Sequence, residues 1–198
     1  MSLPLLREKF QNTRIVLASG SPRRQSLLRE LGIDFEVAGN QGADETWPRY
    51  LDKSEIPLFL AGKKADAYKG IAGDDVLLIT ADTIVWCRKR VMDKPAGRDD
   101  AIAILKELSG RRHQVITGVC LRNSHKSVSF TSATSVWFRD LTDDEINWYV
   151  DNCDPYDKAG AYGIQEWIGL VAIKSIRGSY FNVMGLPVDM LYSELMKF

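Results

Sequence analysis

Apolar positions along this chain fall into two kinds of pattern, and the two kinds alternate. Short continuous apolar runs predict buried strands, whereas apolar residues spaced three and four apart predict amphipathic helices. Strand patterns cover residues 14–18, 35–38, 76–81, 84–86, 114–121, 128–138 and 170–176. Helical patterns cover residues 22–31, 56–69, 99–109, a segment opening with a capping box at 142, and 187–196. The alternation predicts an α/β protein.

The strands at 114–121 and 128–138 are separated only by a polar turn, which predicts hairpin neighbours in the second half of the chain. Strands and helices are therefore mixed, and we expect a three-layer α/β or α+β arrangement around a mixed sheet. There is no internal repeat, and no shift in composition marks a linker. We expect residues 1–198 to form one domain, with room for two lobes.

A strand, a turn of small residues and a helix start follow one another over residues 14–24. Ser21 is a favourable N-cap residue, and Pro22 suits the first helical position. Arg23 and Arg24 then lie in the first helical turn, where the partial positive charge of the helix end disfavours cations. Free backbone N–H groups at the same end bind anions, so a bound phosphate would account for the arginine pair. An ordinary capped helix with solvated arginines is the alternative.

Composition and charge narrow the classes of partner. The 198 residues are 45% hydrophobic, which is enough apolar material for a folded core. Lys and Arg number 26, as do Asp and Glu, and this balance argues against binding a nucleic acid polymer or a membrane surface. Cys87, Cys120 and Cys153 form no CxxC pair and fit a reducing compartment. The sequence shows no signal peptide and no apolar run of membrane-spanning length, so we expect a cytoplasmic protein.

Asp82 interrupts an otherwise apolar run, between Ala81 and Thr83. Burying an ionised carboxylate is costly unless it is paired or binds a metal. One interpretation is structural: the carboxylate caps a strand end or pairs with a buried cation. The other is functional: it is a metal ligand, or a base that activates water.

Three further charged residues have ordinary interpretations when each is taken alone. Glu45 lies in a polar loop predicted over 40–48, Lys64 lies on a predicted helix, and Lys94 follows a predicted hairpin. Side chains in such places are usually solvated. Together with the arginine pair and Asp82, however, they form a set of cations and carboxylates that suits a polyphosphate held with a divalent metal. The absence of P-loop and GxGxxG motifs argues against the common nucleotide-binding folds.

A segment rich in glycine and tyrosine covers residues 154–165 and ends at Gln165. Such a loop with a terminal amide could enclose a planar base and hydrogen-bond to its edge. A structural loop with two packed tyrosines is the alternative. His113 and His125 have no ligand partners at a useful spacing, so we expect no zinc site.

Four motifs, taken in order, resemble the Maf family of nucleoside triphosphate pyrophosphatases, once described as septum formation inhibitors. The motifs are LASGSPRR at 17–24, ADTIV at 81–85, KP at 94–95 and DKAGAYGIQ at 157–165. The resemblance extends from about residue 15 to the closing helix. Each motif is moderately specific alone, and four in the same order are strong support.

The resemblance implies a Maf-type α/β fold with a deep cleft between two lobes. It also implies hydrolysis between the α and β phosphates, giving a nucleoside monophosphate and pyrophosphate, with Mg²⁺ or Mn²⁺ as cofactor. Carried over by motif, Asp82 is the general base and, with Glu45, a metal ligand. The implied substrate contacts are Ser19, Arg23, Arg24, Lys64 and Lys94 on phosphate, and Gln165 near the base or the metal.

The segment ending Gly163-Ile164-Gln165 is similar to the branch of the family that acts on dTTP and UTP. We therefore expect a metal-dependent dTTP/UTP pyrophosphatase, with modified pyrimidine nucleotides as further candidate substrates. A 7-methyl-GTP pyrophosphatase of the same family and a nucleotide-binding regulator of cell division are the alternatives. The resemblance is also compatible with a homodimer.

Some positions depart from the family pattern. Lys63 stands before the mapped lysine, where relatives often have an acid. The loop before Glu45 is one residue longer, so Asp44 is an alternative for the same role. Glu166 and Trp167 are bulkier than expected next to the segment assigned to the base pocket.

Overall fold

The computed structural model describes residues 4–39, 42–70 and 75–198. The chain divides into two compact units. Unit 1 comprises Met1–Asp82, Thr117–Ser132 and Gly185–Phe198, and unit 2 comprises Thr83–Ile116 and Ala133–Met184. The expectation of a single domain over 1–198 stays a prediction beside this division. Residues 40 and 41 of the predicted loop 40–48 lie outside the described residues.

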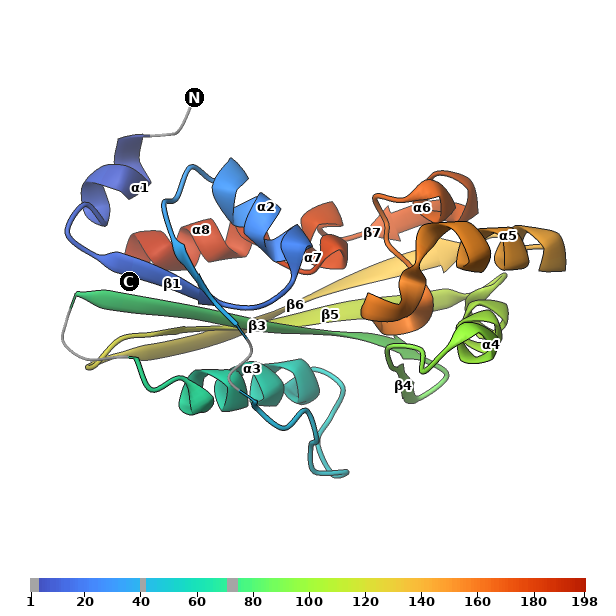
Figure 1. Cartoon of the computed structure of the whole chain (residues 1–198), viewed down its shortest axis with the longest axis horizontal. Coiled ribbons are helices and arrows are strands. Elements are labelled where there is room, and N and C mark those ends of the chain that lie inside the picture. The colour runs from blue at the N-terminus through green and yellow to red at the C-terminus, as the bar shows by residue number, and fades with distance from the viewer. Residues whose placement is uncertain (1–3, 40–41, 71–74) are drawn as a thin grey trace. The chain divides into compact units, whose positions relative to one another are not determined.

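Helices and strands alternate as the apolar pattern predicts (Figure 1). The strands are β1 (Arg14–Ala18), β2 (Glu36–Ala38), β3 (Val76–Cys87), β4 (Arg90–Met92), β5 (Arg112–Arg122), β6 (Ser127–Phe138) and β7 (Ile173–Arg177). The α-helices are α1 (Pro4–Lys9), α2 (Pro22–Glu30), α3 (Glu55–Ala67), α4 (Arg98–Leu108), α5 (Asp143–Cys153), α6 (Trp167–Ala172), α7 (Tyr180–Met184) and α8 (Val188–Lys197). Two 3₁₀ turns, η1 (Pro155–Asp157) and η2 (Ala159–Ala161), follow α5.

The sheet is mixed, as predicted from the sequence. Its strand order over the described residues is β2-β1-β3-β5-β6-β7, with β4 paired to β3. β1 pairs in parallel with both β2 and β3, whereas β4 pairs antiparallel with β3 and β7 with β6. The chain passes from one unit to the other within β3, β5 and β6, so each unit contains parts of these strands.

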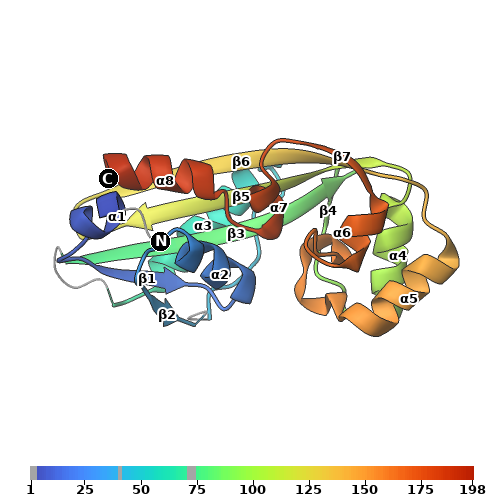
Figure 2. The ribbon, with the colours of Figure 1, turned by 90° about the horizontal axis from the view of Figure 1, so that it is seen from above.

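In unit 1, helices cover both faces of the sheet. α3 lies on one face, and α2 and α8 lie on the other (Figures 1 and 2). Ala61 and Ala65 of α3 are buried against side chains of β1 and β3. Small side chains at these positions let the helix lie close to the strands.

Gly118 of β5 brings α3 closer still. A Cβ atom at Gly118 would overlap the backbone of Pro57 in the first turn of α3. Further along the helix, the hydroxyl of Thr80 in β3 donates to the carbonyl oxygen of Ala61 at 2.7 Å. These two contacts fix α3 against β5 and β3, which sets the position of every later side chain on that face of the helix.

Unit 2 contains a hairpin and a cluster of helices. Arg88 and Lys89 have positive φ values of 49° and 64° in the turn between β3 and β4. Two residues of this conformation make the tight hairpin turn that matches strand twist. α4 packs against α5 and the η2 turn, and α5 against α6 (Figure 2).

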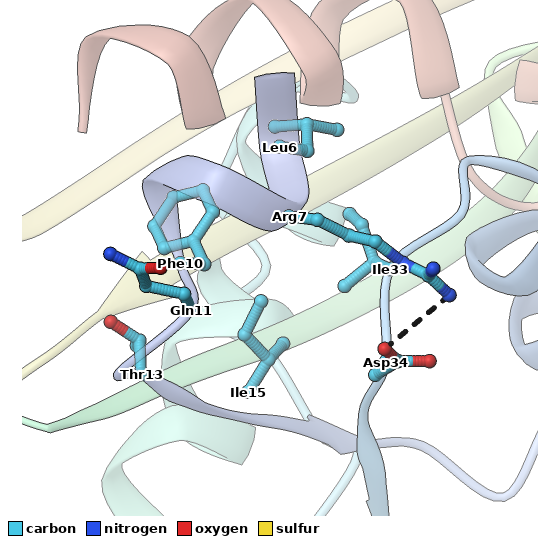
Figure 3. Close-up of a pocket in the computed structure, with 8 residues that line it drawn as sticks. All are labelled: Leu6, Arg7, Phe10, Gln11, Thr13, Ile15, Ile33 and Asp34. Carbon is cyan, nitrogen blue, oxygen red and sulfur yellow. Dashed lines mark ion pairs between the residues drawn. The ribbon is translucent and has the colours of Figure 1, made fainter. Parts of the chain in front are cut away.

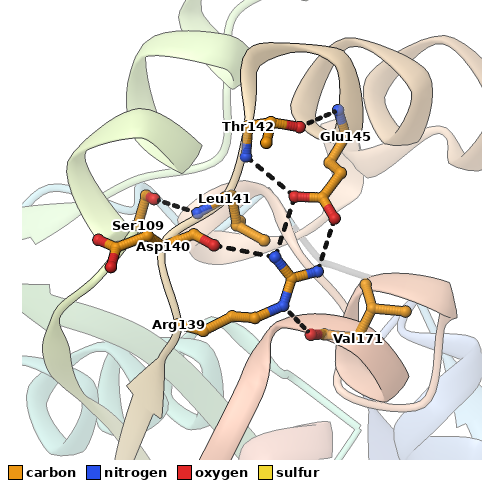
Figure 4. Close-up of polar contacts among 7 residues, drawn as sticks. All are labelled: Ser109, Arg139, Asp140, Leu141, Thr142, Glu145 and Val171. Carbon is orange, nitrogen blue, oxygen red and sulfur yellow. Dashed lines mark hydrogen bonds and ion pairs between the residues drawn. The ribbon is translucent and has the colours of Figure 1, made fainter.

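Arg139, just after β6, ties together several parts of unit 2 (Figure 4). Its guanidinium donates to both carboxylate oxygens of Glu145, at 2.7 and 3.0 Å, and to the carbonyl oxygen of Val171 at 2.6 Å. Glu145 also accepts from the backbone N–H of Thr142, whose hydroxyl accepts from the N–H of Glu145. The capping box predicted at the start of α5 is therefore confirmed.

Three aromatic rings of unit 2, those of His113, Phe138 and Tyr162, pack edge to face with centroids 4.9 to 5.4 Å apart. His113 Nε2 lies 2.8 Å from the hydroxyl of Tyr162. Burial lowers the pKa of the His113 imidazole to about 4. The ring is therefore neutral near pH 7 and acts as a core residue.

This depressed pKa predicts a specific loss of stability in acid. In the unfolded chain His113 takes up a proton near pH 6.5, but in the folded protein only near pH 4. The contribution of the neutral, buried His113 imidazole to the free energy of unfolding is complete above about pH 6.5. It is lost as the pH falls toward 4. Between pH 7 and 4.5 we expect the wild type to lose about 2.5 kcal/mol more unfolding free energy than His113→Gln. Urea unfolding measures this, with the exposed His125→Gln as control; equal losses in wild type and His113→Gln would contradict the prediction.

Two predicted strand boundaries are wrong. β3 runs without a break from Val76 to Cys87, so Asp82 lies inside a strand and does not cap a strand end. Residues 170–172, predicted as strand, belong to α6, and β7 begins at Ile173. The helical period prevails there because Ile168 and Ala172, four residues apart, are both buried.

Candidate functional site

The turn between β1 and α2 presents Ser19 and Arg24 to each other. Ser19 is buried, and its hydroxyl oxygen accepts from Arg24 Nη1 at 3.2 Å and from the backbone N–H of Ser21 at 3.3 Å. Arg24 Nε also donates to the carbonyl oxygen of Gly185, 2.8 Å away. Pro22 begins the helix as predicted, but the Ser21 side chain makes no capping hydrogen bond, and the Ser19 hydroxyl accepts from its N–H instead.

Arg24 is partly buried at this helix start. Burial lowers the pKa of its guanidinium, and the neighbouring charge of Arg23 lowers it further, whereas Asp82 and Glu45 raise it. Arginine stays protonated despite such shifts. Arg23, Asp82 and Glu45 are thus each close enough to act electrostatically on Arg24, which brings four of the residues singled out in the sequence into one region of unit 1.

Lys64 completes this region. Its ammonium Nζ lies 2.5 Å from Asp82 Oδ1 and 2.9 Å from Glu45 Oε1. The Lys64 and Asp82 side chains are only 11% and 13% exposed, whereas Glu45 is 44% exposed. Lys64 is therefore not the solvated helix lysine that the residue alone suggests, and Asp82 is the buried, paired carboxylate that its apolar surroundings require.

The spacing of side chains along β3 and along α3 explains why these residues lie in contact. Thr80 and Asp82 are two apart on β3 and project from the same face of the sheet. Ala61 and Lys64 are three apart on α3 and lie on the same side of the helix. Thr80 bonds to Ala61 and Asp82 pairs with Lys64, so the contact that fixes α3 on the sheet also aligns the second pair.

Neighbouring acids of the loop before α3 pair with neighbouring lysines of the helix. Asp44 Oδ2 lies 3.0 Å from Lys63 Nζ, and Glu45 pairs with Lys64. Hydrogen bonds from Thr46, followed by one from Lys63, hold the pKa of Asp44 at about 2. Of the two loop acids left open by the sequence comparison, Glu45 is the one that shares a lysine with Asp82.

Lys94 and Gln165 belong to unit 2, and both side chains are exposed. The backbone N–H of Gly160 donates to the carbonyl oxygen of Asp93 at 3.2 Å, so the segment carrying Lys94 is attached to the glycine-rich loop. That these two residues join the unit 1 cluster in binding a substrate stays a prediction.

The loop over 154–165 is partly structural. Tyr162 is buried in the aromatic cluster of unit 2, which supports the structural interpretation for this tyrosine, whereas Tyr156 is 37% exposed. Glu166 and Trp167, the bulky pair after Gln165, turn into unit 2: Trp167 packs on Trp148 with centroids 4.6 Å apart.

Sequence reasoning missed the carbonyl of Gly185 as a partner of Arg24, because 161 residues separate the two. It also missed the burial of Lys158, which has 7% of its surface exposed. Neither the spacing nor the composition of the surrounding residues signals either contact.

No group of three or more His, Cys, Asp or Glu side chains within residues 4–39, 42–70 and 75–198 is arranged to hold a metal ion. Asp82 and Glu45 are two carboxylates that meet at Lys64 in this region. Cys87, Cys120 and Cys153 are free thiols. Among the described helices, none has the length and apolarity needed to cross a membrane.

A separate hollow of about 320 Å³ lies beside α1 (Figure 3). Leu6, Phe10 and Ile33 are among its apolar walls, and Arg7 pairs with Asp34 at 3.6 Å on its rim. None of the site residues selected from the sequence lines it. This hollow is therefore distinct from the charged region around Asp82.

The fold and the charged region together define an α/β protein with a cationic strand–helix turn beside a lysine-bridged pair of carboxylates. The family comparison gives a more specific answer. The model described as Maf, Maf-like protein, matches residues 14–198, and the chain belongs to the Maf family.

Relatives similar to this chain cover nearly its whole length. The dTTP/UTP pyrophosphatase of Parabacteroides distasonis is 54% identical over 191 residues, covering 96% of this chain and 99% of the relative. The dTTP/UTP pyrophosphatase of Bacteroides fragilis is 54% identical over 182 residues, covering 92% and 94%. That of Phocaeicola vulgatus is 53% identical over 190 residues, covering 96% and 98%. The family expected from the four motifs is therefore confirmed.

Among solved structures, a HAM1 protein from Coxiella burnetii is similar with a TM-score of 0.41 and 14% identity, covering 64% of this chain and 73% of that one.

Proposed function

We propose that this protein is a dTTP/UTP pyrophosphatase, which hydrolyses the bond between the α and β phosphates and releases the nucleoside monophosphate and pyrophosphate. Relatives with this name are about half identical to the chain over almost their full length. The observation that carries the proposal is the pairing of Asp82 and Glu45 with Lys64 beside Arg24. Such a group of carboxylates and cations suits phosphoryl chemistry, which depends on positioning and charge neutralisation.

In this mechanism Asp82 is the general base. Its carboxylate accepts a proton from the water that attacks the α phosphorus, and the bond to the bridging α–β oxygen breaks as pyrophosphate leaves. Lys64 lies next to Asp82 and stabilises the charge of the leaving group. Arg23 and Arg24, at the start of α2, bind phosphate oxygens together with the hydroxyl of Ser19, which can still donate its hydrogen.

Lys94 and Gln165 are assigned by family resemblance alone, as a phosphate contact and as a contact to the base. A glutamine amide can both donate to and accept from the edge of a pyrimidine. The exposure of Gln165 leaves its amide accessible to a ligand.

A divalent cation fits the donor set, and we assign it to Asp82 and Glu45. Carboxylate oxygens from both residues converge on one cationic atom, Lys64 Nζ. Mg²⁺ in nucleotide enzymes is commonly held by one or two carboxylates together with substrate phosphates, so two protein ligands suffice. When bound, the metal would neutralise phosphate charge. The cytoplasmic location and the homodimer stay predictions; the three free thiols support the former.

Incubation of the purified protein with Mg²⁺ or Mn²⁺ and a panel of ribo-, deoxy- and methylated nucleoside triphosphates tests the function. We expect pyrophosphate, without orthophosphate, from dTTP and UTP, and no product when EDTA replaces the metal. Activity confined to 7-methyl-GTP would support the proposed reaction but contradict the proposed specificity for dTTP and UTP. Nucleotide binding without turnover of any nucleotide would contradict the proposed enzymatic function and favour a nucleotide-binding regulator.

A further inference from the structure

Lys158 is a buried lysine in unit 2 that the mechanism above does not use. Its ammonium Nζ lies 2.9 Å from the carbonyl oxygen of Asp154, 2.8 Å from Asp157 Oδ1 and 3.0 Å from Glu166 Oε1. Three oxygens around three N–H donors satisfy the ammonium completely. All three N–H donors of Lys158 therefore bind groups of the protein itself. Such a lysine serves to hold neighbouring segments of the chain in position.

Glu166 extends this network to Tyr149. Glu166 Oε2 accepts from the hydroxyl of Tyr149, and the tyrosine oxygen in turn accepts from the backbone N–H of Gly163 at 3.2 Å. Tyr149 is fully buried in the core of unit 2. Burial, and then the hydrogen bond to Glu166, raise the pKa of Tyr149, so the phenol stays protonated and can donate.

The network fastens both ends of a four-residue turn. The backbone N–H of Glu166 donates to the carbonyl oxygen of Gly163 at 3.0 Å, which closes a β-turn over residues 163–166. Tyr149 binds the first residue of this turn, and Lys158 and Tyr149 both bind the last.

Gln165 occupies the third position of the turn, between these fixed ends. Its side chain is exposed, whereas Ile164 beside it is only 5% exposed. A Cβ atom at Gly163 would lie 2.7 Å from Glu166 Cδ and 3.0 Å from Gln165 Nε2, so a side chain there would displace both of these side chains. The carboxylate of Glu166 is thus packed against the turn, and Gln165 is the residue that the turn presents to solvent.

We propose that Lys158, Glu166 and Tyr149 form a positioning network that sets the orientation of Gln165 and thereby the discrimination between nucleobases. The inference rests on the proposed function, in which Gln165 contacts the base. An amide that distinguishes bases must be held within about 0.5 Å of its productive position. A glutamine side chain has several free torsions, so the backbone beneath it has to be fixed.

A pair of matched tyrosine variants tests the network. Tyr149→Phe removes the hydroxyl that binds Gly163 and Glu166, and Tyr162→Phe removes another buried hydroxyl, which binds His113 in the core. For Tyr149→Phe we expect the KM for dTTP to rise about ten-fold and the preference for dTTP over CTP to fall about ten-fold, with kcat within about three-fold. Tyr162→Phe should keep the preference of the wild type.

Variants at Lys158 separate charge from packing. Lys158→Arg retains a cation that can bind Asp157 and Glu166, whereas Lys158→Met leaves both carboxylates without it. We expect Lys158→Arg to retain most of the base preference and Lys158→Met to lose it. Should Lys158→Met fail to fold, the comparison of Tyr149→Phe with Tyr162→Phe still decides.

Binding of non-hydrolysable α,β-imido analogues of dTTP and CTP provides a readout without turnover. A wild type that prefers the dTTP analogue but hydrolyses nothing would overturn the proposed function and leave the network testable through binding. An unchanged preference in Tyr149→Phe, accompanied by faster hydrogen exchange at the Glu166 amide, would overturn the positioning role. An unchanged preference in Gln165→Ala would overturn it as well, because Gln165 would then read no base.

Discussion

Asp82→Asn should lower the rate of pyrophosphate release from dTTP by at least about 10³-fold while leaving nucleotide binding largely intact. An amide cannot accept the proton from the attacking water. The substitution also removes one negative charge beside Lys64 and Arg24, which favours rather than weakens the binding of a polyphosphate. Because Asp82 is also assigned as a metal ligand, the comparison is made at saturating Mn²⁺, where the loss should appear in kcat and not in nucleotide affinity.

Two measurements check this result: pyrophosphate release at saturating dTTP, and binding of the α,β-imido analogue of dTTP. Asp66→Asn is the matched control, since Asp66 lies in the same unit and is paired with Arg122 at 2.5 Å, the same separation as that between Asp82 and Lys64. An Asp82→Asn variant with activity within ten-fold of the wild type would remove Asp82 from the role of base.

Glu45→Gln and Asp44→Asn should have opposite outcomes although the two acids are adjacent. Glu45 shares Lys64 with Asp82, whereas Asp44 is bound to Lys63 and Thr46. If Glu45 is a metal ligand, Glu45→Gln raises the Mn²⁺ concentration needed for half-maximal activity by about ten-fold or more. Asp44→Asn should leave that concentration unchanged.

Titration of activity with Mn²⁺, accompanied by direct Mn²⁺ binding to each variant, distinguishes the two acids. The reverse result, with Asp44→Asn impaired and Glu45→Gln normal, would transfer the role to Asp44, the alternative left open by the longer loop. Impairment of both variants to the same degree would indicate a loss of loop structure, and would argue against a specific ligand.

Much of the fold was predictable because the pattern of apolar residues is locally consistent. The strand at residues 14–18 was predicted with the bounds it has, and the helix at Pro22 and the capping box at Thr142 begin where their residues indicate. The prediction was wrong at residues 170–172, where an apolar run is compatible with both strand and helix. Packing of Ile168 and Ala172 favours the helix there, and side-chain packing cannot be inferred from the apolar pattern alone.

The site was predictable as a set of residues but not as a set of contacts. Motif resemblance named Lys64, Asp82 and Glu45, and the structure brings these three together. The residues alone suggested solvated side chains for Lys64 and Glu45, because a pairing across 18 residues depends on how α3 lies on β3. The contact that fixes that helix, from Thr80 to Ala61, involves no charged group and gives no signal in the sequence.

The two successive lysines of α3 also anchor the preceding loop at one fixed point. Lys63 binds Asp44 and Lys64 binds Glu45. These two ion pairs, and not the first residue of the loop, determine how the loop is aligned with the helix. Residues added before Asp44 leave that register unchanged, whereas a residue added between Asp44 and Glu45 would shift one acid away from its lysine. We therefore expect insertions before Asp44 to be tolerated and an insertion between Asp44 and Glu45 to be costly.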